Sequence, residues 1–380
     1  MNMSVEFVEH SKSKHLSAEQ VAEFGQQVER IRREIMDSIG EQDAQYIYKI
    51  RNFVRYSEIA SRGLLMFGGW MPPVWLLGTG LLGLSKIVEN MELGHNVMHG
   101  QFDWLNDPSL NGAAYDWDTM STGDDWKYTH NYIHHTYTNI VGKDHDVGYG
   151  LLRISDLQKW EPRFLLNLPL TLQLMLFFEW YVGLQNLHLE DAIIYKSKTW
   201  AQVWQDSAKF RQKASRQIAK DYLFFPLIAG PNAVAVLTGN VVANLLRNVW
   251  ASAVIFNGHF TEDTETFEQD NTEHETRAEW YLRQIRGSSN FTGTSALHIL
   301  SGNLSHQIEH HLFPDMPANR YAEAAVQIRA LCGEYGIHYN EASFFKQSLS
   351  VWLRVAQYSL PNGYVSGVKQ SIRKLKNLFA

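Results

Sequence analysis

GLLMFGGWMPPVWLLGTGLLGLS, residues 63–85, lies between Arg62 and Lys86 and contains no charged side chain. It exceeds the roughly 20 apolar residues that cross a hydrocarbon core of about 30 Å, but Pro72 and Pro73 interrupt it. Proline removes a helical hydrogen bond and restricts the residue before it. The stretch therefore predicts two membrane helices, over about 52–71 and 73–93, that meet at the proline pair.

Two further apolar stretches follow, at 164–189 and 223–246. A single crossing by 164–189 would place the basic segment from Lys196 to Lys220 outside, against the excess of Lys and Arg expected in cytosolic loops. We therefore expect 164–189 to lie in the membrane interface or to form a shallow hairpin. We expect 220–257 to form two spans that turn near Gly239 and Asn240, which gives four transmembrane helices with both termini in the cytosol.

The remaining segments predict a helical cap on the cytosolic side. From Ser17, with Gln20 completing a capping box, apolar residues recur at helical spacing, which indicates an amphipathic helix packed on this cap. The basic segment at 368–380 suits contact with anionic lipid. We expect one all-α domain, an integral membrane bundle of four transmembrane helices with a cytosolic helical cap. Its parts are an N-terminal cytosolic region 1–50, a transmembrane hairpin 51–94, a cytosolic region 95–219 that includes 164–189, a second transmembrane hairpin 220–258, and a cytosolic cap 259–380.

Composition restricts the class of protein further. The net charge of -6 gives no whole-chain basic field, so we expect no nucleic acid as a partner. The single cysteine, Cys332, can form neither an internal disulfide nor a thiolate metal cluster. Any metal site in this chain must therefore use other ligands. The mean hydropathy of -0.28 is that of a soluble protein, but the apolar residues are concentrated in the stretches above.

Three short motifs contain histidines at matching spacing: HNVMH (95–99), HNYIHH (130–135) and HQIEHH (306–311). Histidines four residues apart share one face of a helix, so two imidazoles can bind one metal. With 16 histidines in 380 residues, H-x-x-x-H-H should occur roughly 0.03 times by chance, yet it occurs at two places. A further histidine follows the last predicted span, and the candidate metal ligands are His95, His99, His130, His134, His135, His259, His306, His310 and His311.

The number of candidate ligands indicates which metal they bind. Imidazole suits Zn, Cu, Fe and Ni alike. Nine ligands are too many for one four-coordinate zinc, but they suit two octahedral irons with positions left open for oxygen. Polar residues beside the motifs offer acceptors for the outer N–H of a bound imidazole. These residues are Glu92, Asp124, Asp125, Asp144, Asp146, Gln307 and Glu309. Each acid among them could instead cap a helix or be a solvated charge.

The motifs resemble those of the membrane fatty-acid desaturases, over about residues 50–325. GHNVMHGQFDWLND (94–107), HHTYTNIVGKDHDVGYG (134–150) and GNLSHQIEHHLFPDMP (302–317) look like the bacterial acyl-CoA and acyl-lipid branch of that family. The resemblance implies two irons and O2-dependent removal of two hydrogens from neighbouring methylenes of an acyl chain, carried by CoA or by a lipid. It also implies an active site facing the cytosol at a bacterial plasma membrane.

The resemblance implies iron-binding roles for every candidate histidine except His306. Relatives in the front-end group read Q-x-x-H-H in the third motif, so either His306 or Gln307 could fill the first ligand position. We prefer His306, because it lies four residues before His310. This chain lacks the H-P-G-G signature of a fused cytochrome-b segment, so we expect electrons from a separate ferredoxin-type or flavin reductase.

Two other functions compete with this interpretation. A fatty acyl or alkane hydroxylase on the same scaffold would use the same metal centre, and only its product would differ. A metal transporter would place ligands within the spans, whereas the histidine motifs lie outside them. The basic run from Lys196 to Lys220 suits topology and lipid contact better than the docking of an acidic ferredoxin.

Overall fold

The computed structural model describes residues 16–185, 187, 189–193, 196–269 and 274–364, so the basic segment at 368–380 lies outside the described residues. The described chain is predominantly helical, as expected, with two short parallel strands, β1 (Asn290–Thr292) and β2 (Glu341–Ser343). The α-helices are α1 (Ala18–Met36), α2 (Glu41–Gly68), α3 (Pro72–Val88), α4 (His95–Met98), α5 (Gly123–Trp126), α6 (His135–Tyr137), α7 (Asn167–Leu176), α8 (Phe178–Gln185), α9 (Leu189–Ile193), α10 (Trp200–Asp206), α11 (Ala208–Ile218), α12 (Phe225–Ile228), α13 (Ala233–His259), α14 (Arg277–Gly287), α15 (Ser295–Leu300), α16 (Gln307–Leu312), α17 (Tyr321–Tyr335) and α18 (Phe344–Tyr358).

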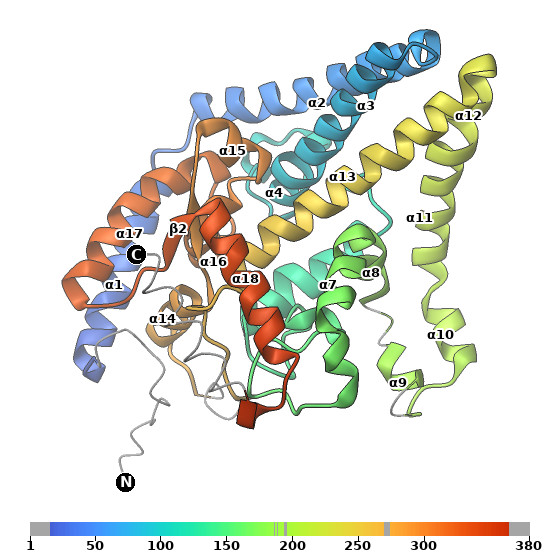
Figure 1. Ribbon diagram of the computed structural model, residues 1–380. Coiled ribbons are helices and arrows are strands. Elements are labelled where there is room, and N and C mark those ends of the chain that lie inside the picture. The colour runs from blue at the N-terminus through green and yellow to red at the C-terminus, as the bar shows by residue number, and fades with distance from the viewer. Residues whose placement is uncertain (1–15, 186, 188, 194–195, 270–273, 365–380) are drawn as a thin grey trace, which may run out of the picture.

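The proline pair separates α2 from α3, as the sequence predicts. Pro72 is the first residue of α3, where a missing N–H costs no helical hydrogen bond. The two helices lie side by side, and α13 packs against α3 (Figure 1). The break between α2 and α3 lies beside the break that precedes α13. Asn232 Nδ2 donates to Met66 O at 2.8 Å and so connects the two.

The predicted turn at Gly239 and Asn240 is wrong, because α13 runs unbroken from Ala233 to His259. The chain reverses earlier, at Gly230–Asn232, where Gly230 has a φ of 55° and a proline follows it. Gly239 has a packing role instead. A Cβ there would lie 3.0 Å from Thr79 Oγ1 and 3.1 Å from the Leu65 side chain, so glycine allows α13 to approach α3 and α2 closely.

The length and composition of the helices leave the four predicted spans unconfirmed. Among the described residues, no helix taken singly is both long enough and apolar enough to cross a membrane. Pro162–Leu176 and Phe178–Gln185 meet these criteria only as a pair, and they are bent by 93° relative to each other. This bend falls inside 164–189, the segment for which we expect an interfacial or hairpin arrangement.

Buried ion pairs account for the charges that interrupt the apolar stretches. Lys86 of α3 lies 2.9 Å from both Asp118 and Asp221. Arg247 of α13 lies 2.5 Å from Glu179 of α8. Removing one partner of such a pair leaves an uncompensated buried charge, which is strongly destabilising. These pairs therefore tie α3 to the Asp118 loop and to the turn at Ala219–Phe224, and tie α8 to α13.

The amphipathic helix predicted from Ser17 is α1, and it forms part of the cap. Ser17 Oγ accepts from the Gln20 N–H at 3.2 Å, and Gln20 Oε1 accepts from the Ser17 N–H at 3.0 Å, which completes the predicted capping box. Its apolar face is buried against α14 and α17. The buried residues of that face are Phe24, Val28, Ile31 and Ile35.

Candidate metal centre

The first histidine motif follows a change of helical pitch at the end of α3. Glu89–Gly94 forms a π-helical turn, and α4 begins at His95. Such turns occur most often at functional sites. The turn rotates the motif relative to α3 and places the His95 and His99 rings 4.7 Å apart.

The second motif also lies on a π-helical segment, Lys127–His134, which follows α5. Thr122 caps α5, because its side chain accepts from the Asp125 N–H. A helix cap is the alternative role that the sequence offers for Asp125. In a π-helix, residues five apart lie on nearly one face. The His130 ring is accordingly close to both His135, at 4.9 Å, and His134, at 5.1 Å.

The third motif meets the end of α13. Helix α16 presents His310 and His311, both fully buried. His259, the last residue of α13, lies 3.0 Å from His311, measured between Nε2 atoms. Gln307 Nε2 also lies 3.0 Å from His259 Nε2. A Cβ at Gly258 would come within 2.8 Å of Gln307, so the glycine permits this approach.

The structure brings eight of the nine predicted histidines together, and seven of them form two adjoining groups in which the ligand atoms lie within 4.8 Å of one another. The third motif divides between them, with His310 in the first group and His311 in the second. His135 is close to both of these residues and adjoins both groups. The first group is His95, His99, His130 and His310, and the second is His134, His259 and His311.

His306 lies apart from both groups. Its ring stacks on that of His298 at 5.0 Å. The spacing of four residues does not place His306 on one helical face with His310, because α16 begins at Gln307 and His306 belongs to the 3-10 turn before it, with φ -106° and ψ 55°. The structure thus places Gln307, and not the preferred His306, beside the clustered histidines.

Hydrogen bonds at the outer ring nitrogens orient many of the clustered imidazoles. The acceptor of His134 is the predicted Asp144, at 3.0 Å. Other partners come from segments far away in the sequence, including Gln284 at 3.0 Å from His311 and Tyr321 at 3.1 Å from His310. Each of these contacts involves Nδ1, so Nε2 faces the interior of the cluster. This is the outer shell typical of metal-binding histidines.

The remaining acidic residues divide into two sets. Asp146 Oδ2 lies 3.6 Å from Nδ1 of both His130 and His134. Among the described residues, neither Glu92 nor Glu309 forms a hydrogen bond with a histidine side chain. Glu92 accepts from Tyr46 at 2.7 Å and from Asn303 at 2.9 Å. Glu309 accepts from Asn290 at 2.8 Å and from Tyr339 at 2.9 Å. Both glutamates therefore fix the segments around them.

Burial favours the neutral form of seven of the eight clustered rings. It lowers the pKa of His95 to about 4 and that of His259 to about 3. Burial, together with neighbouring imidazoles, holds the pKa well below its ordinary value at His99, His130, His135, His310 and His311. Neutral imidazole is the form that binds a metal. At His134 burial acts in the same direction, but Asp144 and Asp146 outweigh it and raise the pKa.

The donor atoms that face the interior of the cluster have the character of a metal site. The Nε2 atoms of the first group are buried and have no hydrogen-bond partner among the described residues, and the same holds for both ring nitrogens of His135. A buried polar atom without a partner is costly unless something else satisfies it. These residues therefore fit a bound metal, which would take up each of the free lone pairs.

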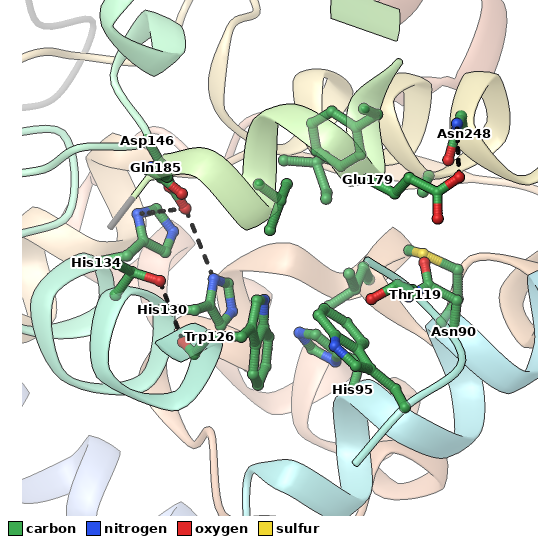
Figure 2. Close-up of a pocket in the computed structure, with 18 of the residues that line it drawn as sticks. Asn90, His95, Thr119, Trp126, His130, His134, Asp146, Glu179, Gln185 and Asn248 are labelled. Atoms are coloured by element: carbon green, nitrogen blue, oxygen red, sulfur yellow. Dashed lines mark hydrogen bonds and ion pairs between the residues drawn. The ribbon is translucent and has the colours of Figure 1, made fainter. Parts of the chain in front are cut away.

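A pocket opens beside the cluster, between the Glu89–Gly94 turn, α8 and α13. Figure 2 shows His130, His134, Asp146 and Gln185 at one end of it and Asn90, Thr119, Glu179 and Asn248 at the other. Aromatic and aliphatic side chains also line the pocket, including Met91, Trp126, Tyr149, Phe178, Val182 and Ile255. The arrangement places an apolar cavity next to the histidines, which suits an apolar chain more than a polar substrate.

Comparison with known proteins agrees with this combination of helical fold, histidine groups and apolar pocket. The family model described as fatty acid desaturase matches residues 69–343. The chain is 43% identical over 356 residues to the NADPH-dependent stearoyl-CoA 9-desaturase of Mycobacterium tuberculosis, covering 92% of this chain and 83% of that protein. It is 28% identical over 295 residues to the sn-1 linoleoyl-lipid 6-desaturase of Synechocystis, covering 75% and 80%. It is 26% identical over 322 residues to human fatty acid desaturase 3, covering 76% and 64%.

The protein is an oxidoreductase. It belongs to the fatty acid desaturase family, and its similarity to the two bacterial proteins confirms the branch expected from the motifs.

Proposed function

We propose that this protein is an O2-dependent fatty acyl desaturase that uses two irons, one held by each histidine group. The carrying observation is the pair of adjoining groups, whose buried imidazole nitrogens lie next to an apolar pocket. Iron, when bound, supplies the oxidising chemistry that unactivated C–H bonds require and that amino-acid side chains lack. The chain's own residues orient the ligands, exclude water and position the substrate.

The proposed ligand set is the eight clustered histidines, with Gln307 beside the second group. Gln307 replaces His306 in this proposal, because its amide lies 3.0 Å from His259 Nε2. The Gln307 Oε1 atom is buried and has no hydrogen-bond partner among the described residues. It is therefore available to a metal, directly or through a bound water.

The proposed reaction balances as a four-electron reduction of O2. Two neighbouring methylenes lose one hydrogen each, which provides two electrons and two protons as the C=C bond forms. A donor provides two more electrons, solvent provides two more protons, and O2 leaves as two waters. The Mycobacterium tuberculosis relative is described as NADPH-dependent, which supports a separate reductase that draws electrons from NADPH.

The basic run from Lys196 to Lys220 gives little support to docking of an acidic donor. Lys198 pairs with Asp206 at 2.8 Å, and Lys213 pairs with Asp116 at 2.5 Å. Lys220 forms an ion pair with Asp118. In these contacts the lysines are paired with carboxylates of the same chain and not with a partner protein. This favours the topological role expected from the sequence.

We further propose that the hairpins at 51–94 and 220–258 enter the membrane with the cluster on the cytosolic side. Large apolar side chains are exposed on α2, α3, α12 and α13, toward the end where both hairpins turn (Figure 1). Contiguous exposed apolar surface of this kind indicates a membrane or protein contact. The exposed residues are Ile59, Phe67, Trp70, Leu76, Leu77, Leu227 and Val234.

The test is the acyl composition of cells that express the chain, compared with cells that express His134→Ala. A new unsaturated acyl chain that is absent from the variant supports the proposal. A hydroxylated chain would instead favour the hydroxylase alternative, and an unchanged profile would contradict both.

A further inference from the structure

The loop after the second histidine motif has an unusual backbone at Tyr149. Gly148, Tyr149 and Gly150 take successive φ values of 70°, 54° and 67°. Glycine adopts this left-handed region readily, whereas for a tyrosine it is unfavourable and persists only where the surroundings impose it. Such strain is concentrated at functional sites. The need to connect the two flanking segments therefore does not by itself explain why the Tyr149 side chain is held in this position.

Short contacts tie this loop to the histidine cluster. The Asp144 carboxylate receives His134 Nδ1 at 3.0 Å and the Asn139 and Asp146 N–H groups at 2.8 and 2.9 Å. The Val147 N–H bonds Asp144 O at 3.3 Å, and the left-handed run begins at the next residue. Tyr149 follows, by only five positions, the Asp144 carboxylate that orients His134, so the loop connects it closely to the cluster.

The Tyr149 ring projects into the pocket wall. It packs edge-on against Phe178 of α8, with ring centroids 5.5 Å apart, and lies 6.2 Å from Phe256 of α13 and 6.4 Å from Phe260, the residue after that helix. It lines the pocket together with His130, His134 and His259. A rigid ring thus stands beside the second histidine group, supported from behind by aromatic side chains of two helices.

We propose that the Tyr149 ring is a positioning residue that fixes which carbons of the acyl chain lie beside the histidine groups. This rests on the proposed desaturase function. Successive methylenes of an acyl chain are chemically alike, so only the shape of the pocket can select the carbons that react. The Tyr149 ring, held at a fixed position in the pocket wall relative to His134, provides that selection.

The experiment compares the double-bond position made by wild type, Tyr149→Phe, Tyr149→Leu and Tyr149→Ala, with the iron content of each purified protein. Tyr56→Ala is the matched control, because it makes the same truncation at an exposed tyrosine of α2 that is not among the described residues lining the pocket. In an apolar pocket one methylene of misfit is worth roughly 10- to 200-fold in discrimination. We therefore expect Tyr149→Ala and Tyr149→Leu to convert a single bond position into a mixture of neighbouring positions, with iron retained.

Tyr149→Phe keeps the ring and should keep the wild-type bond position, and Tyr56→Ala should keep it as well, because that change leaves the pocket wall intact. A single unchanged bond position in both Tyr149→Ala and Tyr149→Leu overturns the inference. So do equal mixtures from Tyr56→Ala, a shift in Tyr149→Phe, or loss of iron in both truncated Tyr149 variants. If wild type makes no unsaturated product, the proposed function fails instead.

Discussion

Nδ1 of His134 lies 3.0 Å from Oδ2 of Asp144, and this contact connects the second histidine motif to the loop that follows it. Asp144 also receives two backbone N–H groups, so its carboxylate is held from three directions. The carboxylate therefore fixes both the orientation of one imidazole and the course of the loop toward Tyr149.

Removal of this carboxylate should weaken metal binding. Outer partners of metal-bound histidines typically account for about 10- to 100-fold in metal affinity, so Asp144→Ala should lose iron at correspondingly lower chelator concentrations. Asp124→Ala is the control, because Asp124 is an exposed acid outside the cluster. Equal chelator resistance in wild type and Asp144→Ala would show that the contact does not support the metal.

The third motif offers a direct choice between two adjacent side chains. Gln307 lies 3.0 Å from His259 Nε2, whereas His306 stacks on His298 outside the cluster. We expect Gln307→Ala to lower the bound iron and His306→Ala to leave it at the wild-type level. Metal analysis of both purified variants decides this, and the reverse pattern would restore His306 as the ligand.

Helix packing at Gly239 should be intolerant of any side chain. A Cβ there would lie 3.0 Å from Thr79 Oγ1, and overpacking of this kind costs about 1–3 kcal/mol. Gly239→Ala should lower the Tm of the detergent-solubilised protein. Gly80→Ala is the matched control, since a Cβ at Gly80 meets nothing within 4 Å and helix propensity favours alanine by up to about 1 kcal/mol. A Tm for Gly239→Ala at or above that of wild type would contradict the packing role.

The ion pair between Asp43 and Arg320, 2.7 Å long, should make stability depend on pH in the acidic range. Burial raises the pKa of Asp43, but hydrogen bonds from Arg320, the Gly40 N–H and Asn319 outweigh it and lower the pKa. A lowered pKa contributes stability above the unfolded-state value of about 3.9, and this contribution is lost as pH falls through the folded value.

Asp43→Asn should therefore cost roughly 1–3 kcal/mol near neutral pH. The difference between the variant and wild type should shrink below about pH 4. Thermal unfolding of both proteins across pH 3–7 measures it. A difference that stays constant across that range would mean that the charge of Asp43 contributes nothing.

Sequence signals that act within a few residues predict the structure well. Pro72 and Pro73 locate the break between α2 and α3, and Ser17 with Gln20 locates the start of α1. The histidine motifs identify seven of the eight clustered side chains, because their local spacing places them on common helical faces, and the eighth, His259, follows from its place after the last predicted span.

Features that depend on distant contacts are not predictable in this way. Gly239 resembles a turn residue by type, but its role depends on Thr79 and Leu65 of other helices. Spacing favoured His306, yet the helix begins one residue later. No spacing pattern connects Gln284 with His311 or Tyr321 with His310, because the fold brings these partners together from separate elements.

The most direct test of the central claim is the metal content of the purified protein after expression in iron-supplemented cells. Wild type should contain two irons per chain, because the clustered histidines form two groups. His95→Ala and His259→Ala each alter a different group, and each should reduce that number. One zinc per chain, or an iron content that neither variant changes, would contradict the account.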